Sequence, residues 1–181
     1  QNSEHVASYY TASAHPAPLH PKLEGDLRTD VVVIGAGYTG ISAALELAQR
    51  GYDVVVLEAH RVGWGASGRN GGQVCTGFSA SLGKIEKQVG LDDARKLFAI
   101  AEEGKALIRE RVQRYGIDCN LKWGYLHAAL KMRHVEEVKE ELDEAQHRFG
   151  YDQLRLVDRD EVRRMVDSPI YVGGLYDAGA G

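Results

Sequence analysis

One short segment constrains the fold of this chain more than any other. Residues 30–34 (DVVVI) include four consecutive apolar β-branched side chains, and the glycine-rich turn 35–40 (GAGYTG) follows directly. A run without polar alternation is typical of a strand buried on both faces of a parallel sheet. Residues 41–50 are rich in helix formers and end at Gly51, and a second apolar run lies within residues 53–58. This order predicts a strand, helix, strand unit.

The three glycines of the turn suit a nucleotide-binding role. Gly35 lets the chain turn sharply off the strand, Gly37 leaves room for a pyrophosphate, and Gly40 lets the helix pack close to the strand. The free amides and the positive end of the helix would then face the phosphates. Glu58 ends the second strand, where a carboxylate can accept hydrogen bonds from both hydroxyls of an adenosine ribose and would repel a 2′-phosphate. A chance glycine turn is the alternative, and the combination of strand, helix and acid disfavours it.

A second glycine-dense segment covers residues 61–73 (RVGWGASGRNGGQ). Its amides, the Ser67 hydroxyl and the cationic Arg69 suit a second contact with the pyrophosphate. Gly71 and Gly72 would let the backbone approach a flat ring closely. A flexible surface loop is the alternative interpretation of the same composition.

At these residues a family resemblance becomes clear. VVVIGAGYTG and VVVLEAHRVGWGASGRNGGQ resemble the FAD-dependent D-amino-acid oxidase superfamily, and within it the bacterial enzymes that oxidise γ-glutamylputrescine and related amines. SYYTASA, RERVQRYGIDCNLKWGYLHAAL and YDAGAG also resemble that group. The resemblance implies FAD as cofactor. The cofactor-binding residues that the motifs and the resemblance indicate are Gly35, Gly37, Tyr38, Thr39, Gly40, Glu58, Ala59, Arg61, Gly65, Ala66, Ser67, Arg69, Asn70, Gly71 and Gly72.

The resemblance also implies an α/β fold class, with a Rossmann-type FAD-binding βαβ unit followed by part of an α+β substrate domain. We expect an N-terminal arm without helical periodicity over residues 1–29, the N-terminal part of the FAD-binding domain over 30–90, and the start of the substrate domain over 91–181. Family members are a little over twice this length. We therefore expect an incomplete piece of a two-domain flavoenzyme, with apolar strand edges exposed when the C-terminal half is missing.

The rest of the chain has weaker patterns. Apolar residues at helical spacing predict a long helix that ends near Gly116 and another over residues 135–149. Residues 121–130 and 170–176 are interpreted as strands. Residues 157–166 are interpreted as a segment that carries a capping box, formed by Asp158 and Glu161.

The resemblance implies oxidation of a small amine, γ-glutamylputrescine or a related polyamine-derived amine, to an imine and then an aldehyde, with electrons passed to oxygen to give hydrogen peroxide. No side chain is a convincing general base, so the catalytic residues stay open. One rival is a flavin dehydrogenase that uses a quinone or a protein as acceptor. Another is a nucleotide-binding fragment without catalysis. On its own, we expect the 181-residue chain to be inactive.

Composition excludes several other classes. The net charge is −4 and no basic run occurs, so electrostatics give no support to nucleic-acid binding. No apolar run is long enough to span a membrane, and cytoplasmic location is the default expectation. The seven histidines show no metal-ligand spacing, so no metal is expected. The two cysteines fit no disulfide framework; Cys75 could be a reactive thiol, although a plain structural role is commoner.

Overall fold

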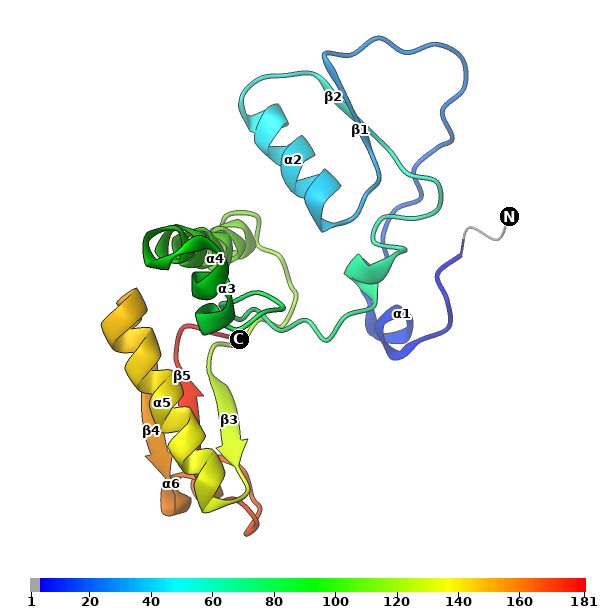
Figure 1. Ribbon diagram of the computed structural model, residues 1–181. Helices are drawn as coiled ribbons and strands as arrows, with labels where there is room; N and C mark the ends of the chain where they lie inside the picture. The colour runs from blue at the N-terminus through cyan, green and yellow to red at the C-terminus, as the bar shows by residue number, and fades with distance from the viewer. Residues whose placement is uncertain (1–3) are drawn as a thin grey trace. The chain divides into compact units, whose positions relative to one another are not determined.

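The computed structural model describes residues 4–181 and divides the chain into two compact units, Gln1–Gly72 and Gln73–Gly181. The boundary lies between residues 72 and 73, whereas the sequence predicted the end of the FAD-binding segment at residue 90. Residues 73–90 thus pack with the second unit. The elements of both units are labelled in Figure 1.

The first unit contains a two-stranded parallel sheet and one crossover helix (Figure 1). Strand β1 (Val31–Ile34) pairs in parallel with β2 (Val54–Leu57), with Val31 opposite Val54. Helix α2 (Tyr38–Gln49) joins the strands and contacts both of them. The predicted strand, helix, strand unit is therefore present, and its helix begins at the glycine turn itself.

The segment before β1 differs from the expected arm in one respect. A short helix, α1 (Tyr9–Ser13), interrupts it, and the Ser8 hydroxyl caps this helix by accepting a hydrogen bond from the Thr11 amide at 3.2 Å. The sequence shows no helical period here because five residues are too few to produce one. A single capping hydroxyl marks the helix start instead.

The apolar side chains of the parallel strands are poorly covered in this chain. Ile34 is 87% exposed and Val32 is 51% exposed, while Val31 and Val33 are half-buried. Because β1 alternates in exposure, α2 covers one face of the pair and leaves the other face open. This agrees with the expectation that two strands and one helix cannot bury a parallel sheet on both faces.

The second unit begins with two consecutive helices, α3 (Leu82–Val89) and α4 (Leu91–Arg114), which contact one another. Gly90 joins them with a φ of +84°, in the left-handed region that favours glycine. The long helix was expected to end near Gly116 and ends two residues earlier. Helix α3 was not predicted, because a helix of two turns shows too little apolar periodicity.

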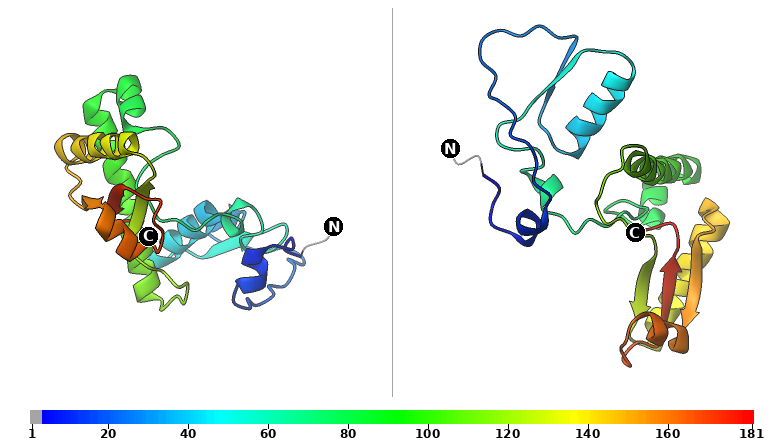
Figure 2. Two further views of the ribbon diagram at one scale, coloured as in Figure 1. Left: turned by 90° about the horizontal axis from the view of Figure 1, so that it is seen from below. Right: turned by 180° about the vertical axis from the view of Figure 1, so that it is seen from behind.

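A three-stranded antiparallel sheet forms the other half of this unit, in the order β3-β5-β4. Its strands are β3 (Tyr125–Ala129), β4 (Leu154–Asp158) and β5 (Gly173–Asp177). Helix α5 (Met132–Phe149) contacts all three strands and lies along one face of the sheet, which Figures 1 and 2 show from opposite sides. Helix α6 (Arg159–Met165) follows β4 directly. Its start is capped as predicted, because the Asp158 carboxylate accepts a hydrogen bond from the Glu161 amide at 2.8 Å.

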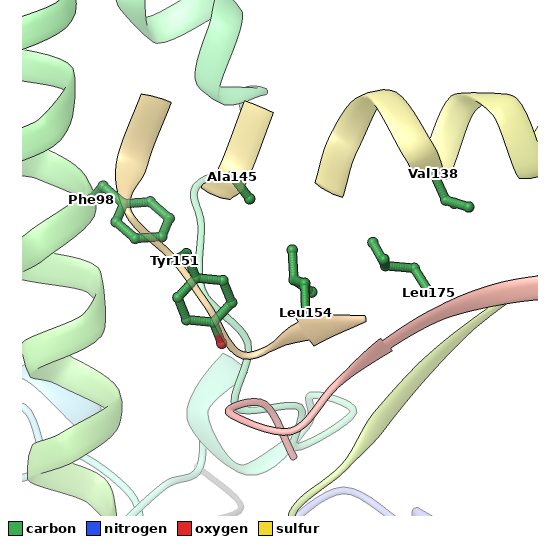
Figure 3. Packing of buried hydrophobic residues seen from close by; sticks show 6 residues of the cluster. All are labelled: Phe98, Val138, Ala145, Tyr151, Leu154 and Leu175. Atoms are coloured by element: carbon green, nitrogen blue, oxygen red, sulfur yellow. The ribbon is translucent and has the colours of Figure 1, made fainter. Parts of the chain in front are cut away.

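The main hydrophobic core belongs to this second unit. It joins Phe98 of α4 to residues of α5, β4 and β5, as Figure 3 shows. The Phe98 ring meets the Tyr151 ring edge to face, with 5.6 Å between centroids. The buried members are Phe98, Val138, Ala145, Tyr151, Leu154 and Leu175.

Candidate functional site

The candidate site starts at the turn between β1 and α2. Gly35 has a φ of +98°, and its amide donates a hydrogen bond to the Leu57 carbonyl at 2.7 Å, which extends the strand pairing by one step. At Gly40 a Cβ atom would lie 1.9 Å from the Gly35 carbonyl oxygen, so no other residue fits. The first and third glycines therefore have the roles in turning and in close packing that the spacing predicted.

Glu58 directly follows strand β2 and lies beside this turn. Its Oε2 accepts a hydrogen bond from the Ala36 amide at 2.7 Å, and its Oε1 accepts one from the His60 amide at 2.9 Å. These two backbone hydrogen bonds, that from Ala36 first, lower the pKa of Glu58 below its ordinary value. Glu58 is thus a fixed carboxylate beside the glycine turn, and its remaining lone pairs could accept the hydroxyls of a ribose.

The second glycine-dense segment folds back onto the start of α2. The Ser67 Oγ accepts a hydrogen bond from the Tyr38 amide at 3.0 Å, and the Asn70 Nδ2 donates to the Tyr38 hydroxyl at 3.1 Å. Ser67 lies in the single 3₁₀ turn η1 (Ala66–Gly68) of this segment. The two glycine motifs are therefore adjacent within the first unit, which favours a built site over a flexible surface loop.

Of the first backbone amides of α2, one has an acceptor in the protein and the next two have none among the described residues. Ser67 takes the amide of Tyr38, whereas the amides of Thr39 and Gly40 bind no acceptor within residues 4–181. The helix offers no internal acceptor to its first amides. The free amides and the positive helix end suit an anion such as a pyrophosphate.

The two arginines of the segment have protein partners. Arg61 forms an ion pair with Glu4, and the indole of Trp64 donates a hydrogen bond to the Glu4 carbonyl at 3.0 Å. The guanidinium of Arg69 lies 5.0 Å from the centroid of the Trp64 ring. Arg61 thus attaches the N-terminal segment to the loop, while Arg69 is exposed and remains near the glycines.

Two buried polar atoms near Glu58 lack partners among the described residues. They are the His60 Nδ1 and the Arg61 Nε. Leaving such atoms unsatisfied costs free energy, so a bound polar group is a natural partner for them. Together with the free helix amides and the fixed carboxylate, they make the first unit a good fit to the adenosine diphosphate part of a dinucleotide.

Other expected site residues lie in the same segment. The Asn70 Oδ1 accepts a hydrogen bond from the Gly72 amide at 2.9 Å and so shapes the end of the loop. Gly71, Gly72 and Ala66 are exposed, Gly65 is half-buried, and Ala59 is exposed beside Glu58. Sequence reasoning missed Ala36 and His60 as the two amides that orient Glu58. The only sequence signal for this role is position, since Ala36 follows Gly35 directly and His60 lies two residues after Glu58.

Comparison with known proteins now identifies the family. The model of the DAO family, described as FAD dependent oxidoreductase, matches residues 30–181. The chain belongs to this family. Its cofactor is FAD, and the resemblance seen in the sequence motifs is confirmed. When bound, FAD supplies the redox chemistry by accepting two electrons and a proton from a substrate.

Two bacterial relatives match nearly the whole chain. A gamma-glutamylputrescine oxidoreductase of Escherichia coli is 45% identical over 99% of this chain and 42% of the relative. A probable oxidoreductase OrdL of Haemophilus influenzae is 44% identical over 98% of this chain and 41% of the relative. The chain thus spans about two fifths of the length of these relatives.

Solved structures share the fold. An L-amino acid deaminase from Proteus myxofaciens superposes with a TM-score of 0.69 at 25% identity, covering 91% of this chain and 35% of that protein. An L-proline dehydrogenase from P. horikoshii gives 0.64 at 24% identity, covering 85% and 37%. The α/β fold class with an FAD-binding βαβ unit is therefore confirmed.

Among residues 4–181, the helices are too short or too polar to cross a bilayer. The same residues contain no group of three or more histidine, cysteine or acidic side chains placed to share a metal ion.

Proposed function

We propose that the protein carrying this chain oxidises γ-glutamylputrescine or a related polyamine-derived amine and passes the electrons to oxygen. The observation that carries the proposal is the 45% identity, over 99% of the chain, to a relative named for γ-glutamylputrescine. The whole protein's substrate is inferred, because the match covers 42% of that relative.

A neutral primary amine loses a hydride from its α-carbon and a proton from its nitrogen, which leaves an imine. Water then hydrolyses the imine to an aldehyde and ammonia. The two electrons and two protons pass to oxygen and give hydrogen peroxide. The residues of this chain would bind and orient the cofactor rather than move these protons, since no general base is evident among them.

Within this proposal the first unit would hold the adenosine diphosphate end of FAD. Gly37 and the amides of Thr39 and Gly40 would receive the pyrophosphate, and Glu58 would bind the ribose. Ser67 and Asn70 would fix the second glycine segment against the first. The support is the hydrogen-bond pattern that joins both segments to the start of α2.

The test uses full-length protein with bound flavin. We expect peroxide release with γ-glutamylputrescine in air, at a rate well above that with putrescine. Absence of turnover with γ-glutamylputrescine and other polyamine-derived amines would overturn the substrate class.

A dehydrogenase with a quinone or protein acceptor is the second candidate. The shared fold does not separate the two, since one structural neighbour is named a proline dehydrogenase. Stopped-flow reoxidation of the reduced enzyme distinguishes them. Fast reoxidation in air supports the oxidase, whereas reoxidation that needs an added quinone supports the dehydrogenase.

A further inference from the structure

The second unit contains a cluster of charged side chains that the FAD site does not use. Lys105 of α4 is only 6% exposed, so its long side chain is almost completely buried. Its Nζ forms an ion pair with Glu102 at 2.9 Å and donates a hydrogen bond to the Tyr151 hydroxyl at 2.9 Å. A buried ammonium needs such partners, and they hold it in one position.

The hydrogen bonds of this cluster form a chain from the Lys105 ammonium through the Tyr151 hydroxyl to the Asp177 carboxylate. The Tyr151 ring packs in the core while its hydroxyl points away from the apolar side chains (Figure 3). That hydroxyl donates to Asp177 Oδ1 at 2.7 Å, so it accepts from Lys105. Thr76 donates its hydroxyl hydrogen to Glu102. The ammonium of Lys105 has three N–H groups, and the partners named here take two of them.

A pocket of about 130 Å³ that is open to solvent lies beside this cluster, and its residues Ala106, Arg109 and Gln153 are exposed. At about 30 Å³ for each water in the liquid, it has room for a small polar group. Its lining residues are Glu102, Lys105, Ala106, Arg109, Gln153 and Gly179. Gly179 is tightly placed, since a Cβ there would lie 2.4 Å from the Tyr151 hydroxyl oxygen. The pocket therefore owes part of its shape to a glycine.

Arg109 supplies the second cation of the lining. Its guanidinium carbon lies 4.0 Å from the centroid of the Trp123 ring. Stacking of this kind holds a guanidinium flat and leaves the N–H groups at its edge free to donate. Among residues 4–181, Arg109 has no hydrogen bond or ion pair to an acceptor besides this ring contact.

The lining has two cations and one carboxylate, and a second carboxylate, Asp177, faces the same cluster by accepting from the Tyr151 hydroxyl and the Gly179 amide. Both carboxylates already have donors, whereas Arg109 and the third N–H of Lys105 bring donors without an acceptor among the described residues. Lys105 and Arg109 are four residues apart on α4, so they lie on the same face of the helix. We propose that this pocket binds one carboxylate group, held by the Arg109 guanidinium and the third N–H of Lys105. A planar carboxylate matches the donor pair at the edge of a guanidinium, and the Arg109 guanidinium has no acidic partner among the described residues.

The carboxylate has two possible sources, a small molecule in solution or an acidic side chain elsewhere in the full-length protein. For the first source, the probe is glutarate titrated into the full-length, FAD-loaded protein, with binding followed by saturation-transfer NMR. Its neutral diamide, glutaramide, is the matched probe. We expect glutarate to bind and glutaramide not to bind.

Two variants on the same helix sharpen this test. Arg109→Leu should weaken glutarate binding by about tenfold or more, a change of about 1.4 kcal/mol or more. Arg114→Leu is the control, because its side chain is 56% exposed and pairs with Glu110 instead. Equal glutarate binding by wild type and Arg109→Leu would overturn the proposal.

If an acidic side chain of the full-length protein already occupies the pocket, glutarate cannot bind there. This second source is therefore tested by thermal stability instead. In that case Arg109→Leu should lower Tm at pH 7 more than Arg114→Leu does, and the difference should shrink as pH falls and the occupying carboxylate takes up a proton. Glu102 and Asp177, which face the same cluster, are present in both variants. No glutarate binding together with a pH-independent effect of Arg109→Leu would contradict the proposal.

Discussion

The two units of this chain differ in how much apolar surface they bury. Among residues 4–181, the first unit has only Ala36 and Ala44 as buried apolar residues, whereas the second has a core of large side chains around Phe98 and Tyr151. The first unit instead concentrates free amides, a fixed carboxylate and glycines at one end of its sheet. The second unit is therefore organised by its own packing, whereas the first has little core and gathers polar backbone groups at one turn.

The two units should differ most in whether they unfold cooperatively when each is expressed alone. Residues 73–181 expressed alone should unfold cooperatively in urea, because their sheet, α5 and α4 share one core. Residues 1–72 alone should show no cooperative transition, since small pieces with little buried apolar surface are marginal. Circular dichroism during urea titration measures both. A cooperative transition for 1–72 would break the comparison.

Removing one aromatic ring from the core should strongly destabilise the second unit. Phe98→Ala is expected to lower its free energy of unfolding by about 3–5 kcal/mol, as for other buried aromatic truncations. The matched control is Ile100→Ala on the same helix, where the side chain is 60% exposed and the change should stay within about 0.5 kcal/mol. Similar losses in both variants would show that α4 is not packed through Phe98.

A change at Glu58 should act on the ligand instead of on packing. Glu58→Gln in the full-length protein is expected to weaken FAD binding by about 1–3 kcal/mol, because hydrogen bonds to a charged acceptor contribute in that range. Titration of apoprotein with FAD measures the change. Unaltered affinity would remove Glu58 from the ribose.

The same carboxylate predicts a pH dependence. The folded protein lowers the pKa of Glu58, so its carboxylate stays ionised above the ordinary pKa of a glutamate. The contribution of this carboxylate to FAD binding is therefore complete there and is lost as pH falls through the lowered pKa. FAD affinity should therefore be flat near neutral pH and fall in acid more steeply for wild type than for Glu58→Gln. Parallel curves for the two proteins would contradict this assignment.

The smallest effect is a gain in the second unit. Gly104 lies within α4 with nothing within 4 Å of the position of its Cβ atom. Gly104→Ala should raise the free energy of unfolding by about 0.5–1 kcal/mol, because alanine loses less backbone entropy in a helix. The same urea titration measures it, and a loss of stability would mean that this helix face is covered.

The sequence predicted the first unit better than the second for a physical reason. The strands from Val31 and Val54 and the helix between them depend on local runs and on glycines, which one segment of sequence displays in full. Strand β4 was missed because its residues overlap the segment interpreted around Asp158, and its pairing with β5 is a long-range contact. The pocket at Lys105 was missed because its lining residues come from distant parts of the chain, from Glu102 to Gly179, and share no motif.

We propose that the glycine turn of the first unit holds the pyrophosphate of FAD, and a substitution at Gly37 tests this proposal. The Gly37 φ of −86° suits any residue. A Cβ there would lie 3.0 Å from the Ser67 Oγ and 3.9 Å from the Ser67 Cβ, so the Ser67 side chain must shift slightly, while no backbone atom beyond the neighbouring residues lies within 4 Å. Gly37→Val should therefore leave the turn folded while filling the space for phosphate. The measurement is flavin absorbance per polypeptide in the purified full-length variant, with Gly104→Ala as control. We expect almost no retained flavin in Gly37→Val and full retention in the control. Stoichiometric flavin in a folded Gly37→Val protein would contradict the account.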